Sequence, residues 1–232
     1  MPSGPWYLDS VIWNALTTRQ ANISEGSDAA RRFIPEISIL AGVLEPSPQA
    51  FADLAQVCQT GDRVSIWDEN EYQLQPGFEV VAAAPLYQMV LDPGHFKAEP
   101  ARTEPAILTL STPDVPEMLA LTKLTRPGPF GIRTHELGDY LGIRVDGELA
   151  AMCGERLRVP GYTEMSAICT HPSHTGKGYA RLLMHEIARR ILARGETPIL
   201  HVREDNERAI SVYKAMGFAI RHRRYFVVLQ RT

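Results

Sequence analysis

Apolar and polar residues follow two different periods along the first part of this chain, and each period predicts one type of element. Ser47 and Pro48 are typical of the first turn of a helix, and apolar residues at helical spacing follow them. Residues 63–67 and 78–81 have the pattern of strands. We therefore predict a small α+β unit over residues 1–92, in which no motif points to a particular chemistry.

The pattern after residue 105 predicts a regular succession of strands and helices. Strands are predicted at residues 106–110, 140–145, 149–155, 163–170, 198–202 and 225–229. Helices are predicted from Thr112, over residues 179–193, and from Asp205 or Asn206 to Gly217. The dipeptide Asp146-Gly147 predicts a tight hairpin. Prolines, glycines and charges over residues 93–105 predict a linker, so residues 106–232 are expected to form a mixed α/β domain.

Composition and charge narrow the class of protein. Of 232 residues, 44% are hydrophobic and 22% charged, which is typical of a folded globular chain. The net charge of −3 gives no reason to expect nucleic acid as a partner. The three cysteines form no CxxC pair, and Cys169 is expected to be a buried small apolar residue. No signal peptide or membrane-spanning run is evident, so we expect a soluble, cytoplasmic protein that does not contact membranes.

A candidate anion-binding turn follows the predicted strand at residues 163–170. Gly176 and Gly178 stand directly before a predicted helix. Backbone N–H groups at the start of a helix lack partners and lie at the positive end of its dipole, and glycine lets an anion come close. The turn is therefore either a phosphate cradle or a plain connection between strand and helix, and two glycines alone do not decide between them.

Two common phosphate-binding motifs do not fit this turn. A Walker turn needs glycine five residues before the Gly-Lys pair, where His171 stands, and Ser or Thr after Lys177, where Gly178 stands. The dinucleotide-binding fingerprint needs a third glycine at position 181, which is arginine.

Two stretches resemble the GNAT superfamily of acyl-CoA N-acyltransferases. The stretch Thr175-Gly176-Lys177-Gly178-Tyr179-Ala180 is similar to the family's acyl-CoA turn, with Thr175 where the family has Gln or Arg. The stretch from Asn206 through Tyr213 to Phe218 resembles the family's Asn-x-x-Ala-x-x-x-Tyr-x-x-x-Gly-Phe signature. Asn206 and Tyr213 are two helical turns apart, so both can face one groove. The resemblance covers residues 105–232 and implies a central mixed, largely antiparallel sheet flanked by helices.

The resemblance implies a set of residues that contact the donor, acetyl-CoA. The pyrophosphate would lie on the turn, and the pantetheine would hydrogen-bond the strand before it. The residues implied are Ile168, Thr170, Thr175, Gly176, Lys177, Gly178, Tyr179, Ala180, Arg181 and Asn206. Tyr213 would protonate the departing thiolate. Taken singly, Asn206 is better explained as a helix cap and Tyr213 as a core residue, and only their combination behind the glycine turn favours the acyltransferase.

The amine acceptor needs a general base, and Glu164 is the first candidate. It lies four residues before Ile168 on one predicted strand, so strict alternation places both side chains on one face. A solvated carboxylate at a strand end is an equally good interpretation, and Glu155 is a weaker candidate. His171 and His174 have the spacing of a metal pair but no third ligand nearby, so we expect no metal.

The function predicted is transfer of an acyl group, most simply acetyl, from CoA to a primary amine by direct attack in a ternary complex. The layout is similar to that of glycine N-acyltransferase-like proteins, in which an N-terminal half-domain leans on the catalytic domain. The acceptor would be a small-molecule or peptide amine, and a homodimer is compatible with the sequence. The alternative function is an acyl-CoA-binding sensor or interaction module without catalysis.

Overall fold

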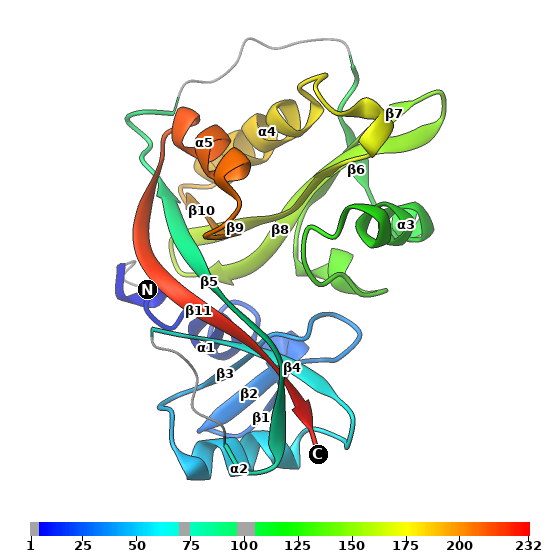
Figure 1. Cartoon of the computed structure of the whole chain (residues 1–232). Coiled ribbons are helices and arrows are strands. Elements are labelled where there is room, and N and C mark those ends of the chain that lie inside the picture. Colours follow the sequence, from blue (N-terminus) through cyan, green and yellow to red (C-terminus); the bar gives the residue numbers. More distant parts are fainter. Residues whose placement is uncertain (1–4, 70–74, 97–104) are drawn as a thin grey trace.

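One eight-stranded sheet runs through both halves of the molecule (Figure 1). The computed structural model describes residues 5–69, 75–96 and 105–232. The strand order is β4-β11-β5-β10-β9-β8-β7-β6. The strands are β4 (Arg63–Asp68), β5 (Phe78–Leu91), β6 (Leu108–Leu110), β7 (Tyr140–Val145), β8 (Glu148–Val159), β9 (Tyr162–Thr170), β10 (Thr197–Arg203) and β11 (Phe218–Arg231). Neighbouring strands are antiparallel, apart from the parallel pair β9 and β10.

Helices cover both faces of this mixed α/β sheet, as predicted. Helices α4 (Tyr179–Ala193) and α5 (Glu207–Ala215) pack on one face, and α3 (Val115–Thr125) packs on the other. Alternate residues of β8 serve the two faces, because successive side chains of a strand point in opposite directions. Cys153 belongs to the core under α4, whereas Met152 belongs to the core under α3.

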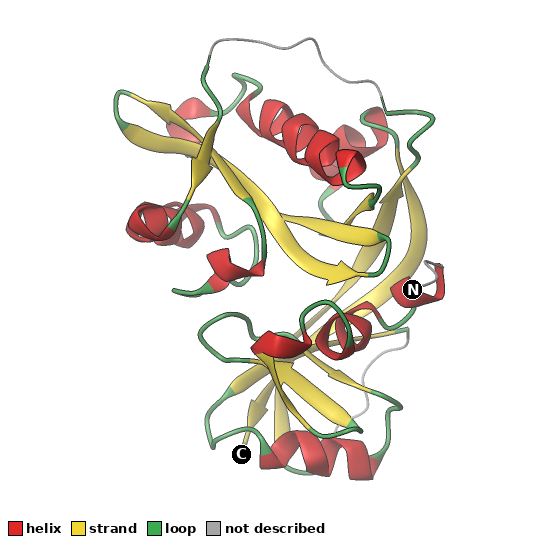
Figure 2. Cartoon of the chain, turned by 180° about the vertical axis from the view of Figure 1, so that it is seen from behind, coloured by secondary structure: helices red, strands yellow, loops and turns green. Residues whose placement is uncertain are grey.

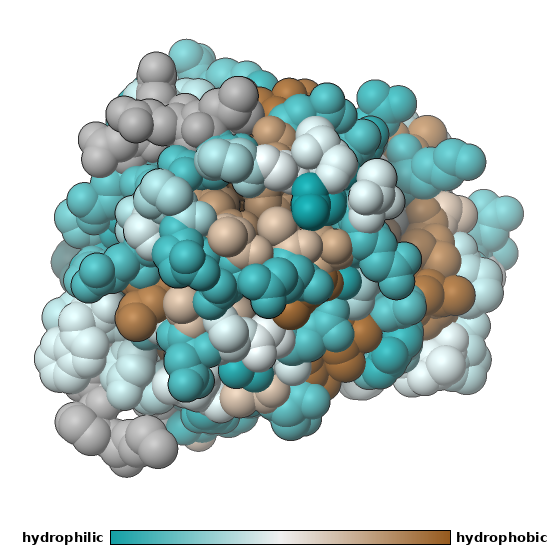
Figure 3. Space-filling view, turned by 90° about the horizontal axis from the view of Figure 1, so that it is seen from below, coloured by the Kyte–Doolittle hydropathy of each residue, from teal (hydrophilic) through white to brown (hydrophobic). Residues whose placement is uncertain are grey.

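The N-terminal part adds a small sheet to the large one. Its elements are α1 (Val11–Thr17), β1 (Ser24–Gly26), β2 (Ala30–Phe33), β3 (Ala41–Val43) and α2 (Pro48–Gln56). Figure 1 and Figure 2 show long strands passing from the upper half into the lower half, with α2 at the far end. Seen from below, the molecule presents separate hydrophobic patches among hydrophilic residues (Figure 3).

Most elements that local signals predicted are present. The Ser47 hydroxyl accepts a hydrogen bond from the Ala50 N–H, as expected of the cap of α2. Asp146 and Gly147 both have positive φ, 51° and 87°, which a type I′ hairpin turn requires. The strands predicted at residues 78–81 and 225–229 are much longer, because β5 and β11 pair with each other over nearly their whole length.

The sheet does not divide at the predicted linker. Residues 97–104, most of the predicted linker 93–105, lie outside the described residues. Strands β4 and β5, which precede the linker, flank β11 at the end of the chain. The division into a unit of residues 1–92 and a domain of residues 106–232 stays a prediction, and the hydrogen-bonded sheet spans both.

Candidate functional site

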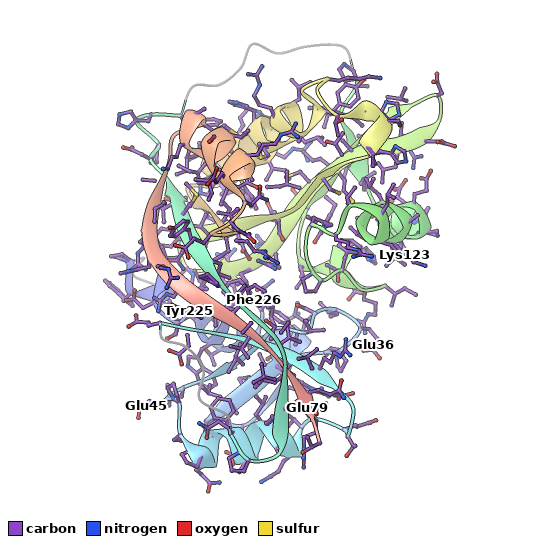
Figure 4. All side chains as sticks on the ribbon, in the orientation of Figure 1. Glu36, Glu45, Glu79, Lys123, Tyr225 and Phe226 are labelled. Atoms are coloured by element: carbon purple, nitrogen blue, oxygen red, sulfur yellow. The ribbon has the colours of Figure 1, made fainter. Side chains whose placement is uncertain are left out.

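A cavity of 560 Å³ opens where β9 and β10 separate. The two strands pair only from Thr197↔Tyr162 to Ile199↔Glu164, and beyond that point they diverge. The cavity wall also includes β4, β5, β11, the start of α5 and the loop that follows α3 (residues 125–129). Figure 4 shows Phe226 between the two halves, with Lys123 on the upper half and Glu36 on the lower.

The floor of the cavity comes from strands on both sides of the predicted linker. Ser65 on β4 pairs with Val228 on β11, and Trp67 pairs with Phe226. All four residues line the cavity, together with Leu86 of β5. The first part of the chain therefore contributes directly to the candidate site.

One wall is the second half of β9, which has a bulge. Ala167 has a φ of +51°, and the pairing register with β8 shifts between Met152 and Gly154. An extra residue in a strand reverses the alternation of side chains beyond it. Ile168 packs against the core that contains Met165, and Met165 points to the opposite face from its neighbour Glu164, so the common face expected from strict alternation is absent. Ile168 and Thr170 both line the cavity.

Helix α5 brings the two residues of its signature to the cavity. The Asn206 side-chain oxygen accepts a hydrogen bond from the Ala209 N–H at 3.2 Å, which caps the helix, and the carboxamide nitrogen takes no part in this cap. Tyr213 lines the same cavity and packs edge-on against Phe218, with ring centroids 6.2 Å apart. Desolvation raises the pKa of Tyr213, so the phenol keeps its proton at neutral pH.

The glycine turn precedes α4 and exposes its first backbone N–H groups. Gly176 and Gly178 have φ values of +80° and +81°, and Gly178 is the N-terminal cap residue without a side chain to satisfy the helix. A Cβ at either glycine would meet open space, so the surface over the turn is accessible. A helix of 15 residues that starts this way attracts an anion.

The other predicted donor-binding residues surround this turn. The Thr175 hydroxyl donates to the Pro172 carbonyl at 3.0 Å, and Lys177 Nζ lies 3.1 Å from Nδ1 of His174. Tyr179, Ala180 and Arg181 form the first turn of α4.

Glu164 is fully buried in a polar network at the point where β9 and β10 part. Its carboxylate accepts hydrogen bonds from Arg156 Nε at 2.8 Å and Nη2 at 2.6 Å, and Nδ1 of His201 lies 2.7 Å from Oε1. Desolvation alone would raise the pKa of Glu164, but Arg156 and His201 outweigh it and lower this pKa to about 2. The carboxylate is ionised and enclosed, which is not the environment of a solvated strand end.

His201 connects this network to the cavity. Its Nε2 lies 3.1 Å from Nε2 of Gln88, whose own Oε1 accepts from Arg221. An amide nitrogen donates only, so the imidazole accepts at Nε2 and donates from Nδ1 to Glu164. Desolvation, opposed by Glu164, lowers the pKa of His201, and the ring is neutral at pH 7.

Glu155, the weaker candidate for the base, does not line the cavity, whereas the buried Cys169 does. Glu155 is buried, and its Oε1 accepts a hydrogen bond from Arg194 at 2.6 Å. Cys169 is buried, as predicted. In the described ranges there is no cluster of three or more metal-ligating side chains. Among the same residues no helix is long and apolar enough to cross a membrane.

Sequence reasoning missed three residues of this region: Trp67, Arg156 and His201. The Trp67 ring packs against the His201 ring, with centroids 4.3 Å apart and the planes tilted by 48°. The Arg156 guanidinium carbon lies over the Trp67 ring, 5.2 Å from its centroid. The available signal was a single polar residue, His201, between apolar Leu200 and Val202 in the strand predicted at residues 198–202. Its partners come from other strands, which the local pattern does not indicate.

Comparisons with known proteins agree with this geometry. Residues 140–227 match the family described as FR47-like protein. A crystal structure of a GNAT-family acetyltransferase from Novosphingobium aromaticivorans is 35% identical, with a TM-score of 0.87, and the match covers 97% of this chain and 98% of that one. A GCN5-related N-acetyltransferase from Kribbella flavida has the same fold, with 14% identity, a TM-score of 0.63 and 95% of each chain covered.

A curated relative matches less than half of this chain. The N-alpha-acetyltransferase RimI of Mycobacterium tuberculosis is 36% identical over 94 residues, which is 38% of this chain. The match spans 58% of the length of that relative.

Proposed function

Because this chain belongs to the GNAT family of acetyltransferases, we propose that it transfers the acetyl group of acetyl-CoA to a primary amine held in the cavity between β9 and β10. The observation that carries this proposal is the arrangement of three features. The second half of β9 and Tyr213 of α5 line one cavity, and the exposed start of α4 follows β9 along the chain after the short connection 171–178.

The donor would lie along β9 and end at the glycine turn. Beyond Glu164, β9 pairs with β8 on one side and has no strand partner on the other among the residues described. The backbone at Ile168 and Thr170 can therefore bind the amide groups of pantetheine as an added strand would. The first N–H groups of α4, with Gly176 and Gly178, would receive the pyrophosphate.

The proposed reaction is direct acyl transfer. The amine nitrogen attacks the thioester carbonyl carbon, and the tetrahedral intermediate then expels the CoA thiolate. Tyr213, whose pKa is raised by desolvation, donates its proton to this sulfur. The acetylated nitrogen loses one proton, and this proton needs an acceptor on the enzyme or in solvent.

Glu164 would serve as base only through His201. Among the described residues that line the cavity there is no carboxylate, and His201 is the lining residue whose ordinary pKa lies near neutrality. We propose that Nε2 of His201 takes the proton while Glu164 holds Nδ1. The attacking amine nitrogen would have to replace the Gln88 amide, which donates to Nε2 in this structure.

The acceptor we propose is the N-terminal amine of a polypeptide. The relative from Mycobacterium tuberculosis is named as an N-alpha-acetyltransferase, and it is 36% identical to this chain over 94 residues. Three further properties stay predictions. They are the kinship of the N-terminal part with the half-domain of glycine N-acyltransferase-like proteins, the cytoplasmic location and the homodimer.

Release of free thiol from acetyl-CoA tests this function. We expect release with peptides that have a free N-terminus and none with the same peptides acetylated beforehand. Calorimetry with acetyl-CoA alone, run in parallel, separates binding from turnover. Tight binding without thiol release, over a broad panel of peptides and small amines, would favour the non-catalytic sensor instead.

A further inference from the structure

We propose that the open edge of β5, over residues 79–84, pairs with the backbone of the acceptor polypeptide and guides its N-terminus into the cavity. This inference rests on the proposed function, because it concerns the acceptor of the same site. It adds a recognition element that contacts the main chain of the substrate rather than its side chains.

The edge exists because β10 is shorter than β5. Strand β10 pairs with β5 from Leu86↔Arg203 to Val90↔Ile199, and β5 continues beyond Leu86 toward Phe78 with β11 as its partner on the other side. Among the described strands none pairs with this second edge of β5 between Phe78 and Pro85. The edge is therefore open.

Backbone parity identifies the groups that point outward. The Pro85 carbonyl accepts a hydrogen bond from the Glu204 N–H at 3.1 Å, so the polar backbone groups of Pro85 face the β10 side. Because these groups alternate along a strand, those of Ala84 face β11, and the N–H and C=O of Ala83 face the open side. Val81 is an extra residue of a bulge, since Val80 and Ala82 oppose consecutive residues of β11.

The side chains along this edge are apolar, small and exposed. Val80 is 46% and Val81 42% exposed, and Ala82 and Ala83 are exposed as well. Residues 80–84 contain no charge, and Glu79 at the start of the edge accepts a hydrogen bond from Gln230 at 3.0 Å. Proteins usually protect an edge with charges, prolines or bulges, because an uncharged open edge readily pairs with another extended chain. Here the bulge at Val81 and the proline at position 85 bound the uncharged stretch, and the outward N–H and C=O of Ala83 lie between them.

The edge leads directly into the cavity, which is why we assign it to the substrate. Ala84 pairs with Phe226 and Ala82 with Val228, so these alanines share the face that forms the cavity floor. Leu86 lines the cavity itself. Ala83 is three residues, about 10 Å, from Leu86 at the usual rise of a strand. An extended peptide with its N-terminus in the cavity would reach Ala83 with roughly its fourth residue.

Peptide length tests the inference with the intact enzyme. We expect kcat/KM for synthetic Ala/Ser peptides to rise about 10-fold or more between the dipeptide and a peptide of about eight residues. Ala83→Pro removes the outward N–H and should abolish this gain while dipeptide turnover stays the same. Ala83→Ser keeps the N–H and should retain the gain. N-methylation of single backbone nitrogens in the long peptide probes the same pairing without changing the protein.

The results distinguish this inference from the proposed function. Two results would overturn the inference and leave the proposed function intact. One is an equal kcat/KM for the dipeptide and the long peptide, and the other is a gain in kcat/KM with peptide length that is the same in Ala83→Pro as in the native chain. Failure of every peptide to react would overturn both. If sedimentation equilibrium shows a dimer that Ala83→Pro converts to a monomer, the edge belongs to a second copy of this chain, and the inference is wrong.

Discussion

Tyr213 is the residue whose chemistry depends most directly on its surroundings. It lines the cavity, and the burial that raises its pKa also keeps it protonated at neutral pH. Tyr213→Phe keeps the ring against Phe218 but removes the donated proton. We expect turnover with acetyl-CoA to fall about 10²–10⁴-fold, with acetyl-CoA affinity unchanged in calorimetry.

An activated thioester is the matched control for this prediction. Its thiolate leaves without a proton, so Tyr213→Phe should lose far less activity with it than with acetyl-CoA. An equal loss, or none, with both donors would show that the hydroxyl has no part in the departure of the thiolate and that the ring only packs.

Glu164 should matter to stability as well as to catalysis. Glu164→Gln leaves the Arg156 guanidinium buried without its anion, which typically costs about 3–5 kcal/mol. The pKa of Glu164 is lowered from 4.5 to about 2 in the folded state, so its stabilising contribution is complete above pH 4.5 and is lost as pH falls from 4.5 to 2. Urea unfolding across this range should show a smaller pH dependence for Glu164→Gln than for the native chain.

Substitution of His201 distinguishes a catalytic role of this network from a structural one. If its Nε2 accepts the proton of the amine, His201→Asn should lower kcat/KM by about 10²–10⁴-fold and remove the acidic limb of the pH profile. Protonation of the imidazole as pH falls is the physical reason for that limb. A mutant that is less stable but has the native pH profile would show that His201 only supports the fold.

At the scale of elements, the start of α4 combines glycines at positive φ with a helix N-terminus that no side chain of the cap residue satisfies. Gly178→Ala places a Cβ at φ +81° over the proposed pyrophosphate site, so we expect acetyl-CoA binding to weaken about 10-fold or more in calorimetry. Backbone strain should also cost about 1 kcal/mol of unfolding free energy.

Gly147 provides a matched control for that substitution. It has a φ of +87° and open space around an added Cβ, as Gly178 does, but it lies in the hairpin between β7 and β8. Gly147→Ala should lose similar stability and keep the affinity for acetyl-CoA. Equal affinities in the two variants would contradict the placement of the pyrophosphate.

The bulge in β9 is an element-scale feature that the amino-acid pattern does not reveal. Residues 163–170 predict a regular strand, and local propensity does not indicate a positive φ at alanine. The bulge lies where β9 passes beyond its pairing with β10, and the pairing with β8 shifts register there. As a result Ile168 lines the cavity whereas Glu164 joins the buried network.

At the scale of the whole molecule, the two predicted units share one sheet and several polar contacts. Gln20 donates to the Arg156 carbonyl at 2.7 Å and accepts from the Arg158 N–H at 3.0 Å. Asp9 accepts from Arg221 near the other end of the chain. We therefore expect the chain to unfold as one cooperative unit.

Tryptophan fluorescence and circular dichroism test this expectation. Trp6, Trp13 and Trp67 all precede residue 92, so their fluorescence reports the N-terminal part, whereas far-ultraviolet circular dichroism reports the whole chain. The two urea transitions should coincide. Loss of the fluorescence signal at lower urea, with most of the dichroism retained, would support independent domains divided near the predicted linker.

The amino-acid sequence by itself determined the features that depend on neighbours along the chain. Asn206 as the cap of α5, the hairpin at Asp146-Gly147 and the glycine turn before α4 each need only a few consecutive residues, so their signals are local. The family followed from two such stretches. The sequence also predicted that Asn206 caps the helix that contains Tyr213, and both residues line the cavity.

Only the tertiary structure decided what surrounds these residues. The cavity floor joins Trp67 and Phe226, which are far apart in the chain and meet because β11 inserts between β4 and β5. Glu164 acquires Arg156 and His201 as partners from two different strands, and those contacts set its pKa and remove it from the cavity wall. Strand order and register are long-range choices that local patterns leave open, because each strand can satisfy its backbone with several partners.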